Sequence, residues 1–264
     1  MNARWDLHIH TPYCDGASPA RESVEAALAL GLETIGFSGH AHTPFDESYC
    51  MSVENTARYV SEIRALQAEY RGRIKILLGV EQDLYADPLS ADYDYVIGSV
   101  HYLRLGDSFI PVDEGNDHLR KAADMWFGGD PLAVAEAYFE AVGDMAETVK
   151  PDIVGHFDLI MKYQERDPFH DPSSPRYVRA WRQAADRLLA AGSIFEINTG
   201  AIARGLRSVP YPDAEILRYL RDSGGRFVFS SDSHRAGTLA YGFAECRALA
   251  DALGLRFGGD LPKR

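Results

Sequence analysis

The chain has 264 residues, a formal net charge of −12, and 46% hydrophobic residues. This composition is typical of a soluble globular protein, and the length predicts a single domain spanning residues 1–264. An acidic chain without a basic stripe argues against nucleic-acid binding, and no apolar run is long enough to span a membrane. Three cysteines without a Cys-x-x-Cys spacing, together with no visible secretory signal, predict a cytoplasmic protein.

Seven short apolar segments are expected to be β-strands. They cover residues 4–9, 34–38, 75–80, 95–100, 153–155, 194–198 and 226–230. Their almost continuous apolarity is typical of parallel strands that are covered on both faces. Helices are expected over residues 18–31, 53–70, 130–149, 174–192, 213–222 and 239–253, and only the third and fourth strands lack a helix between them.

This alternation of strands and helices predicts a parallel sheet. Because no glycine-rich fingerprint follows the first strand, a closed seven-stranded (β/α) barrel is favoured over a dinucleotide-binding fold. The long segment 102–129, which contains several glycines, is expected to be an ordered loop over the mouth of the barrel.

Polar side chains gather at the carboxyl ends of the predicted strands. Seven of the nine histidines lie there, namely His8, His10, His40, His42, His101, His156 and His234. They are joined by Asp15, Glu81 and Asp232. The carboxyl ends of parallel strands meet at one rim of a barrel, and imidazole and carboxylate groups are common metal ligands. The pattern therefore predicts a metal site at the C-terminal rim, with His8 and His10 on one face of the first strand and Leu7 and Ile9 on the other.

The motifs at these strand ends resemble those of the polymerase and histidinol phosphatase (PHP) family. They are residues 6–11 with 14–16, 38–40, 79–81, 98–101, 155–156 and 231–234. Residues 98–102, 110–113, 156–160 and 196–200 further resemble the monofunctional histidinol-phosphate phosphatases of histidine biosynthesis. The resemblance implies a distorted seven-stranded TIM-like barrel that holds three divalent metal ions; Zn, Mn and Fe all suit such ligands.

The resemblance also implies a set of ligands for each ion. His8, His10, Glu81 and Asp232 would hold the first ion. Glu81 would bridge to the second ion, which His101 and His156 would complete. The third ion would be held by Asp15, His40 and His234; some family members have histidine at the position of Asp15.

The activity that we expect is hydrolysis of L-histidinol phosphate to L-histidinol and phosphate. Hydroxide activated by the metals would attack phosphorus, and the catalytic roles would fall to Glu81, Asp232 and His234. Asp232 or a nearby histidine would protonate the leaving oxygen. One alternative is a PHP phosphoesterase that acts on small nucleotides or nucleic-acid ends, and another is a metal-binding module without catalysis.

Several residues are candidates for contacting a small phosphate ester. Arg204 is the favoured phosphate ligand because guanidinium binds phosphate bidentately, with Arg207 and Lys162 as further candidates. His42 is a candidate for a substrate contact, and Asp113 or Glu196 for binding the cationic histidinol, although Glu196 could equally be structural. A homo-oligomer is possible, and no nucleic-acid or membrane partner is expected.

Overall fold

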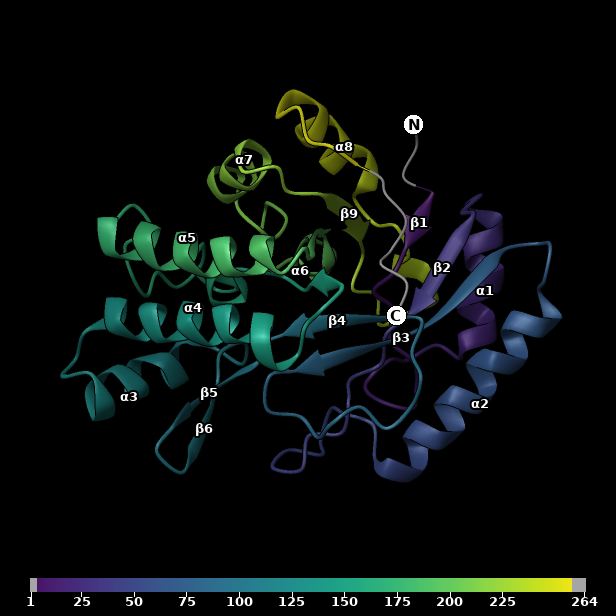
Figure 1. Cartoon of the computed structure of the whole chain (residues 1–264), viewed down its shortest axis with the longest axis horizontal. Helices are drawn as coiled ribbons and strands as arrows, with labels where there is room; N and C mark the ends of the chain where they lie inside the picture. The colour runs from purple at the N-terminus through teal and green to yellow at the C-terminus, as the bar shows by residue number, and fades with distance from the viewer. Residues whose placement is uncertain (1–3, 258–264) are drawn as a thin grey trace.

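The computed structural model describes residues 4–257, and its centre is a parallel sheet of seven strands that curls into a nearly closed barrel (Figure 1). The strands lie in the order β1 (Trp5–Asp6), β2 (Thr34–Phe37), β3 (Lys75–Asp83), β4 (Tyr95–Ser99), β7 (Ile153–Val154), β8 (Ile194–Asn198) and β9 (Phe227–Ser230). The first and last strands meet just beyond their ends, where His10 N donates to Ser233 O at 2.9 Å and Ser233 N donates to His8 O at 3.0 Å. The expected distorted TIM-like barrel is confirmed.

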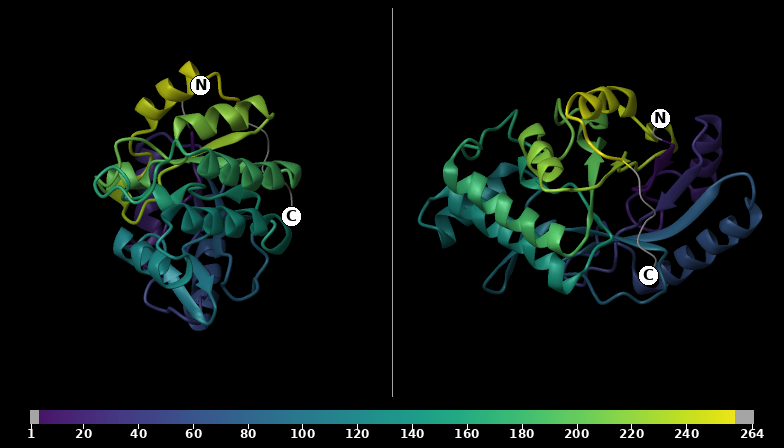
Figure 2. Two further views of the ribbon diagram at one scale, coloured as in Figure 1. Left: turned by 90° about the vertical axis from the view of Figure 1, so that its left-hand side faces the viewer. Right: turned by 45° about the horizontal axis from the view of Figure 1, so that its top comes forward.

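Helices surround this barrel on the outside (Figure 2). They are α1 (Ala20–Ala29), α2 (Val53–Glu69), α4 (Pro131–Thr148), α5 (Pro175–Ala190), α7 (Ala214–Asp222) and α8 (Phe243–Ala252). Short turns follow three strands as η1 (Leu159–Met161), α6 (Gly200–Ala203) and η2 (Ala236–Thr238). Side-chain caps fix several helix starts; for example, Ser52 Oγ accepts from Asn55 N at the start of α2, and Asp130 precedes Pro131 at the start of α4. Within residues 4–257, no helix has the length and apolarity needed to cross a membrane.

The interior of the barrel is filled by a small apolar cluster that is supplied by the strands and by Leu7, which directly follows β1. Its members are Leu7, Tyr95, Ile97, Ile153, Ile194 and Val228. Tyr95 is its largest side chain, and its ring occupies the space beside Gly79, where an added Cβ would lie 2.2 Å from the Tyr95 ring. Two larger clusters lie between the strands and the outer helices. The closed apolar interior leaves the polar chemistry to the carboxyl ends of the strands.

The first strand departs from the simple alternation that we expected. Leu7 belongs to the interior cluster, whereas Ile9 packs in an outer cluster with residues of α1 and α2, so the two do not share a face. The Tyr95 hydroxyl lies 2.5 Å from Leu7 O and 3.2 Å from Phe37 O, in the place of ladder hydrogen bonds. Pairing resumes where Ser38 N donates to Ile9 O at 2.9 Å. This interruption explains why β1 ends at Asp6.

The segment 102–129 is more regular than the loop that we expected. It forms an antiparallel hairpin of β5 (Tyr102–Leu105) and β6 (Ser108–Pro111), followed by α3 (Asn116–Trp126). The turn between the strands contains Gly106 with a φ of 61°, a conformation that glycine adopts without strain. The hairpin packs against the chain before α2 through Phe109, whose ring stacks on Phe45 at 3.6 Å between centroids.

Candidate metal centre

Glu81 lies at the centre of a group of histidine rings. It belongs to β3, is 1% exposed, and projects among side chains that follow four other strands. Its carboxylate oxygens lie 3.0 Å from His8 Nε2, 3.0 Å from His156 Nε2, 3.1 Å from His40 Nδ1, and 3.5 Å from both His10 Nε2 and His101 Nε2. One buried carboxylate thus approaches five imidazoles.

The carboxylates of this centre favour positive charge on the groups between them. Burial by itself would raise the pKa of Glu81, but the surrounding imidazoles, His8 first, lower it well below its usual value. In the same way burial would lower the pKa of His8, but the carboxylates around it, Glu81 first, raise it well above its usual value. His40 differs, because burial outweighs its carboxylate neighbours and lowers its pKa to about 3.

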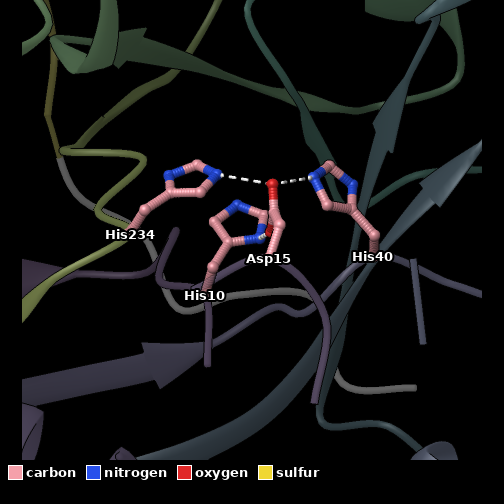
Figure 3. Close-up of side chains that lie close together, drawn as sticks. All are labelled: His10, Asp15, His40 and His234. Carbon is pink, nitrogen blue, oxygen red and sulfur yellow. Dashed lines mark hydrogen bonds and ion pairs between the residues drawn. The ribbon is translucent and has the colours of Figure 1, made fainter. Parts of the chain in front are cut away.

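A second group of candidate ligands lies at the more open edge of the centre (Figure 3). Asp15 Oδ2 lies 3.0 Å from His234 Nε2 and 3.8 Å from His40 Nε2, while Asp15 Oδ1 lies 3.3 Å from His10 Nδ1. The rings of His10 and His234 stack with centroids 4.1 Å apart. The side chains of Asp15 and His234 are 30% and 29% exposed, so this edge is open to solvent.

Two buried nitrogens show that these residues fit metal ions. His10 Nε2 and His40 Nδ1 face Glu81 but have no hydrogen-bond partner among the described residues. Three groups have ligand atoms that lie within 4.8 Å of one another. They are His10, Asp15, His40 and His234; His8, His10 and Asp232; and His40, Glu81 and His101. Unpaired imidazole nitrogens beside carboxylates are a donor set for divalent ions such as Zn, Mn or Fe.

The structure brings all nine predicted ligands together. His156 lies outside the three groups, although its Nε2 is 3.0 Å from Glu81 Oε1. His10 belongs to two groups, and His40 lies in a group with Glu81 as well as in the one with Asp15. The allotment of the nine residues to three separate ions therefore stays a prediction.

A cavity of about 500 Å³ opens beside the ligands. Two of the predicted phosphate ligands, Arg204 and Lys162, line it. Arg204 Nη2 lies 3.0 Å from Asp232 Oδ2, and Lys162 Nζ lies 2.9 Å from Asp113 Oδ2. Each cation is thus held at the edge of the cavity by a carboxylate.

Two other predicted substrate contacts do not reach this cavity. Arg207 is 5% exposed, forms an ion pair with Asp213, and lies over the Tyr211 ring at 4.4 Å. His42 lies at the protein surface, where its Nδ1 is 2.8 Å from Asp87 Oδ2. The structure places both side chains away from the ligands, because each is held by a carboxylate elsewhere.

Two carboxylates lie behind the predicted ligands, and the first of them, Asp83, was not identified from the sequence. Asp83 Oδ2 accepts from His101 N at 2.8 Å and lies 3.3 Å from His101 Nδ1. Its position two residues after Glu81, on the same side of β3, is the signal that could have revealed it. Glu196, which the sequence leaves open as a histidinol contact or a structural residue, is 1% exposed and lies against His8, and this position favours the structural role.

Comparison with known proteins places the chain in a family. Residues 6–200 match the PHP domain family. A protein of Deinococcus radiodurans named "Probable histidinol-phosphatase" is 30% identical over 260 residues, which cover 93% of this chain and 92% of that protein. The histidinol-phosphatase of Bacillus subtilis is 28% identical over 263 residues, covering 90% of this chain and 96% of that protein.

A solved structure has the same fold. The histidinol phosphate phosphatase of Lactococcus lactis, crystallised with zinc, L-histidinol and phosphate, aligns with a TM-score of 0.71 and 24% identity over 97% of this chain and 95% of its own. From the family match and the full-length relatives, we conclude that the chain belongs to the PHP domain family.

Proposed function

We propose that this protein is a metal-dependent phosphomonoesterase that hydrolyses L-histidinol phosphate to L-histidinol and phosphate. The observation that carries the proposal is the cavity of about 500 Å³, which is lined by seven of the nine predicted metal ligands and by the cations Arg204 and Lys162. The similarity over more than nine-tenths of the chain to a protein named as a histidinol-phosphatase supports this substrate.

The side chains that would hold divalent ions are those clustered around Glu81 and Asp15. We propose three ions, with Glu81 shared between two of them. When bound, such ions supply Lewis-acid chemistry that activates water and stabilises negative charge on phosphoryl oxygens.

The protein's own residues have separable tasks in this reaction. Arg204, which lines the cavity together with Glu81, binds phosphoryl oxygens, and its bond to Asp232 keeps its guanidinium oriented. Asp232 and His234 both line the cavity beside Arg204, so either can hold the proton that the leaving oxygen takes. Asp113 also lines the cavity, where its carboxylate, which also pairs with Lys162, can face the cationic group of the alcohol.

Phosphate release from a panel of esters tests the proposal. Purified protein loaded in turn with Zn, Mn or Fe is assayed with histidinol phosphate and with nucleoside monophosphates. We expect the highest kcat/KM with histidinol phosphate. Equal or faster turnover of nucleotides would favour the nucleotide phosphoesterase, and no turnover of any ester would favour a binding module.

A further inference from the structure

A buried carboxylate on β8 organises the histidines from beneath. Ile194 belongs to the apolar interior of the barrel, and Glu196, two residues further along the strand, points to the same side. Phe195 and Ile197 pack outward against the helices. Glu196 therefore lies between the apolar interior and the predicted metal ligands.

We infer that Glu196 is a positioning residue, which fixes the tautomer of His8 and the main chain of His156 and so prepares both imidazoles to bind metal. The inference goes beyond the reaction itself, because it concerns how the site is assembled. It rests on the proposed function only where activity is the readout.

Four groups surround the Glu196 carboxylate, and each has a proton to donate. Oε2 lies 3.0 Å from His8 Nδ1 and accepts from Ser230 Oγ at 2.5 Å. Oε1 accepts from His156 N at 2.5 Å and from Asn198 Nδ2 at 2.7 Å. An ionised carboxylate offers only acceptors, so it satisfies all four groups at once. Both oxygens are fully used within the barrel, which leaves none for the substrate.

The bond to His8 decides which ring nitrogen faces the centre. With the proton on Nδ1 held by Glu196, a neutral His8 presents the lone pair of Nε2. That nitrogen lies 3.0 Å from Glu81 Oε2 and 3.8 Å from Asp232 Oδ1. A lone pair so close to two carboxylates requires either a second proton on Nε2, as in the metal-free protein, or a metal cation among these groups.

Glutamine at position 196 has the same shape but the wrong donors. Its single oxygen can accept a hydrogen bond from the side of His8 or from the side of His156, but not from both. The backbone N–H of His156 can only donate. If the oxygen faces His156, the amide NH₂ faces His8 Nδ1 and drives the ring to the other tautomer, with the proton on Nε2. If the amide is flipped, two N–H groups oppose each other at His156. Either arrangement weakens metal binding without creating a cavity.

The test is the metal affinity of Glu196→Gln, measured by competition with a chelator. We expect affinity to fall about 10- to 100-fold, the range typical for losing a carboxylate behind a histidine ligand. Asp152→Asn is the matched control. Asp152 is also buried and accepts from Val96 N at 2.8 Å, but it lies at the opposite end of the barrel, so we expect unchanged metal affinity.

Nitrogen NMR of the zinc-loaded wild-type protein gives a readout that does not depend on how Glu196→Gln folds. The His8 signal, identified by its absence in His8→Gln, should show a proton on Nδ1. A proton on Nε2, or unchanged metal affinity in folded Glu196→Gln, would overturn the inference. If the wild-type protein binds metal as described but leaves histidinol phosphate intact, the proposed function is wrong while this inference stands.

Discussion

Replacing Arg204 measures how much of catalysis depends on a cation that is not a metal. Its guanidinium lines the cavity, lies 3.0 Å from Asp232 Oδ2 through Nη2, and lies 3.3 Å from Asp232 O through Nη1. Burial would lower its pKa, but Asp232 more than compensates and raises it, so the side chain stays charged. Arg204→Met keeps the length of the side chain and removes its charge and donors.

The expected loss follows from counting hydrogen bonds. Because both terminal nitrogens already contact Asp232, we count one further charge-assisted bond to a phosphoryl oxygen. Such a bond is worth about 1.5–3 kcal/mol, which corresponds to a loss of about 10- to 150-fold in kcat/KM. Arg204→Lys keeps the positive charge but lacks the planar guanidinium, so its kcat/KM should lie between those of Arg204→Met and the wild-type protein.

Steady-state kinetics with histidinol phosphate, at a metal content measured for each sample, are the assay. Metal content is the control because Arg204 contacts Asp232, a predicted ligand. If Arg204→Met keeps kcat/KM within about threefold of the wild-type value at equal metal content, Arg204 does not bind the phosphoryl group.

Three further predictions concern Glu81, Arg207 and His170. Glu81→Ala should lose two metal ions and nearly all activity, because the carboxylate that approaches five imidazoles is gone; full metal content by mass spectrometry would refute the shared role. Arg207→Met should cost about 3–5 kcal/mol in urea unfolding, because it leaves the buried Asp158 carboxylate, 3.8 Å from Arg207 Nη1, without a cation, and KM should not change; a tenfold rise in KM would place Arg207 at the substrate. Burial lowers the pKa of His170 to about 4, so the unfolded chain takes up a proton that the folded protein does not. Metal-free protein should therefore lose about 2 kcal/mol more than His170→Leu between about pH 7 and pH 5, and equal losses would show that His170 titrates normally.

The sequence was informative about the centre because its chemistry repeats at equivalent places. Each parallel strand delivers the residue after its carboxyl end to the same rim, so His101 and His156 could be grouped without knowing any distance. The strands themselves were readable because both of their faces are buried. The runs of apolar residues and the positions of the polar residues at strand ends were enough to predict these features.

Features that depend on one long-range contact could not be predicted in this way. Arg204 and Arg207 are three residues apart and have the same chemistry, yet one lines the cavity and the other is buried against Asp213. The break in the first strand arises from the hydroxyl of Tyr95, which is 88 residues from Leu7 along the chain. No pattern in the neighbouring sequence indicates either contact.

The centre changes in character from the interior of the barrel towards solvent, and this order has a physical reason. The apolar cluster around Tyr95 closes the bottom, and Glu196 and Glu81 above it are each 1% exposed. Asp15 and His234 form the open edge. Burying carboxylates without cations is costly, so the deep pair can remain ionised only because imidazoles and, when bound, metal ions surround it. The edge formed by Asp15 and His234 is partly exposed and therefore pays a smaller penalty than the deep carboxylates, which suits it to face the substrate in the proposed reaction.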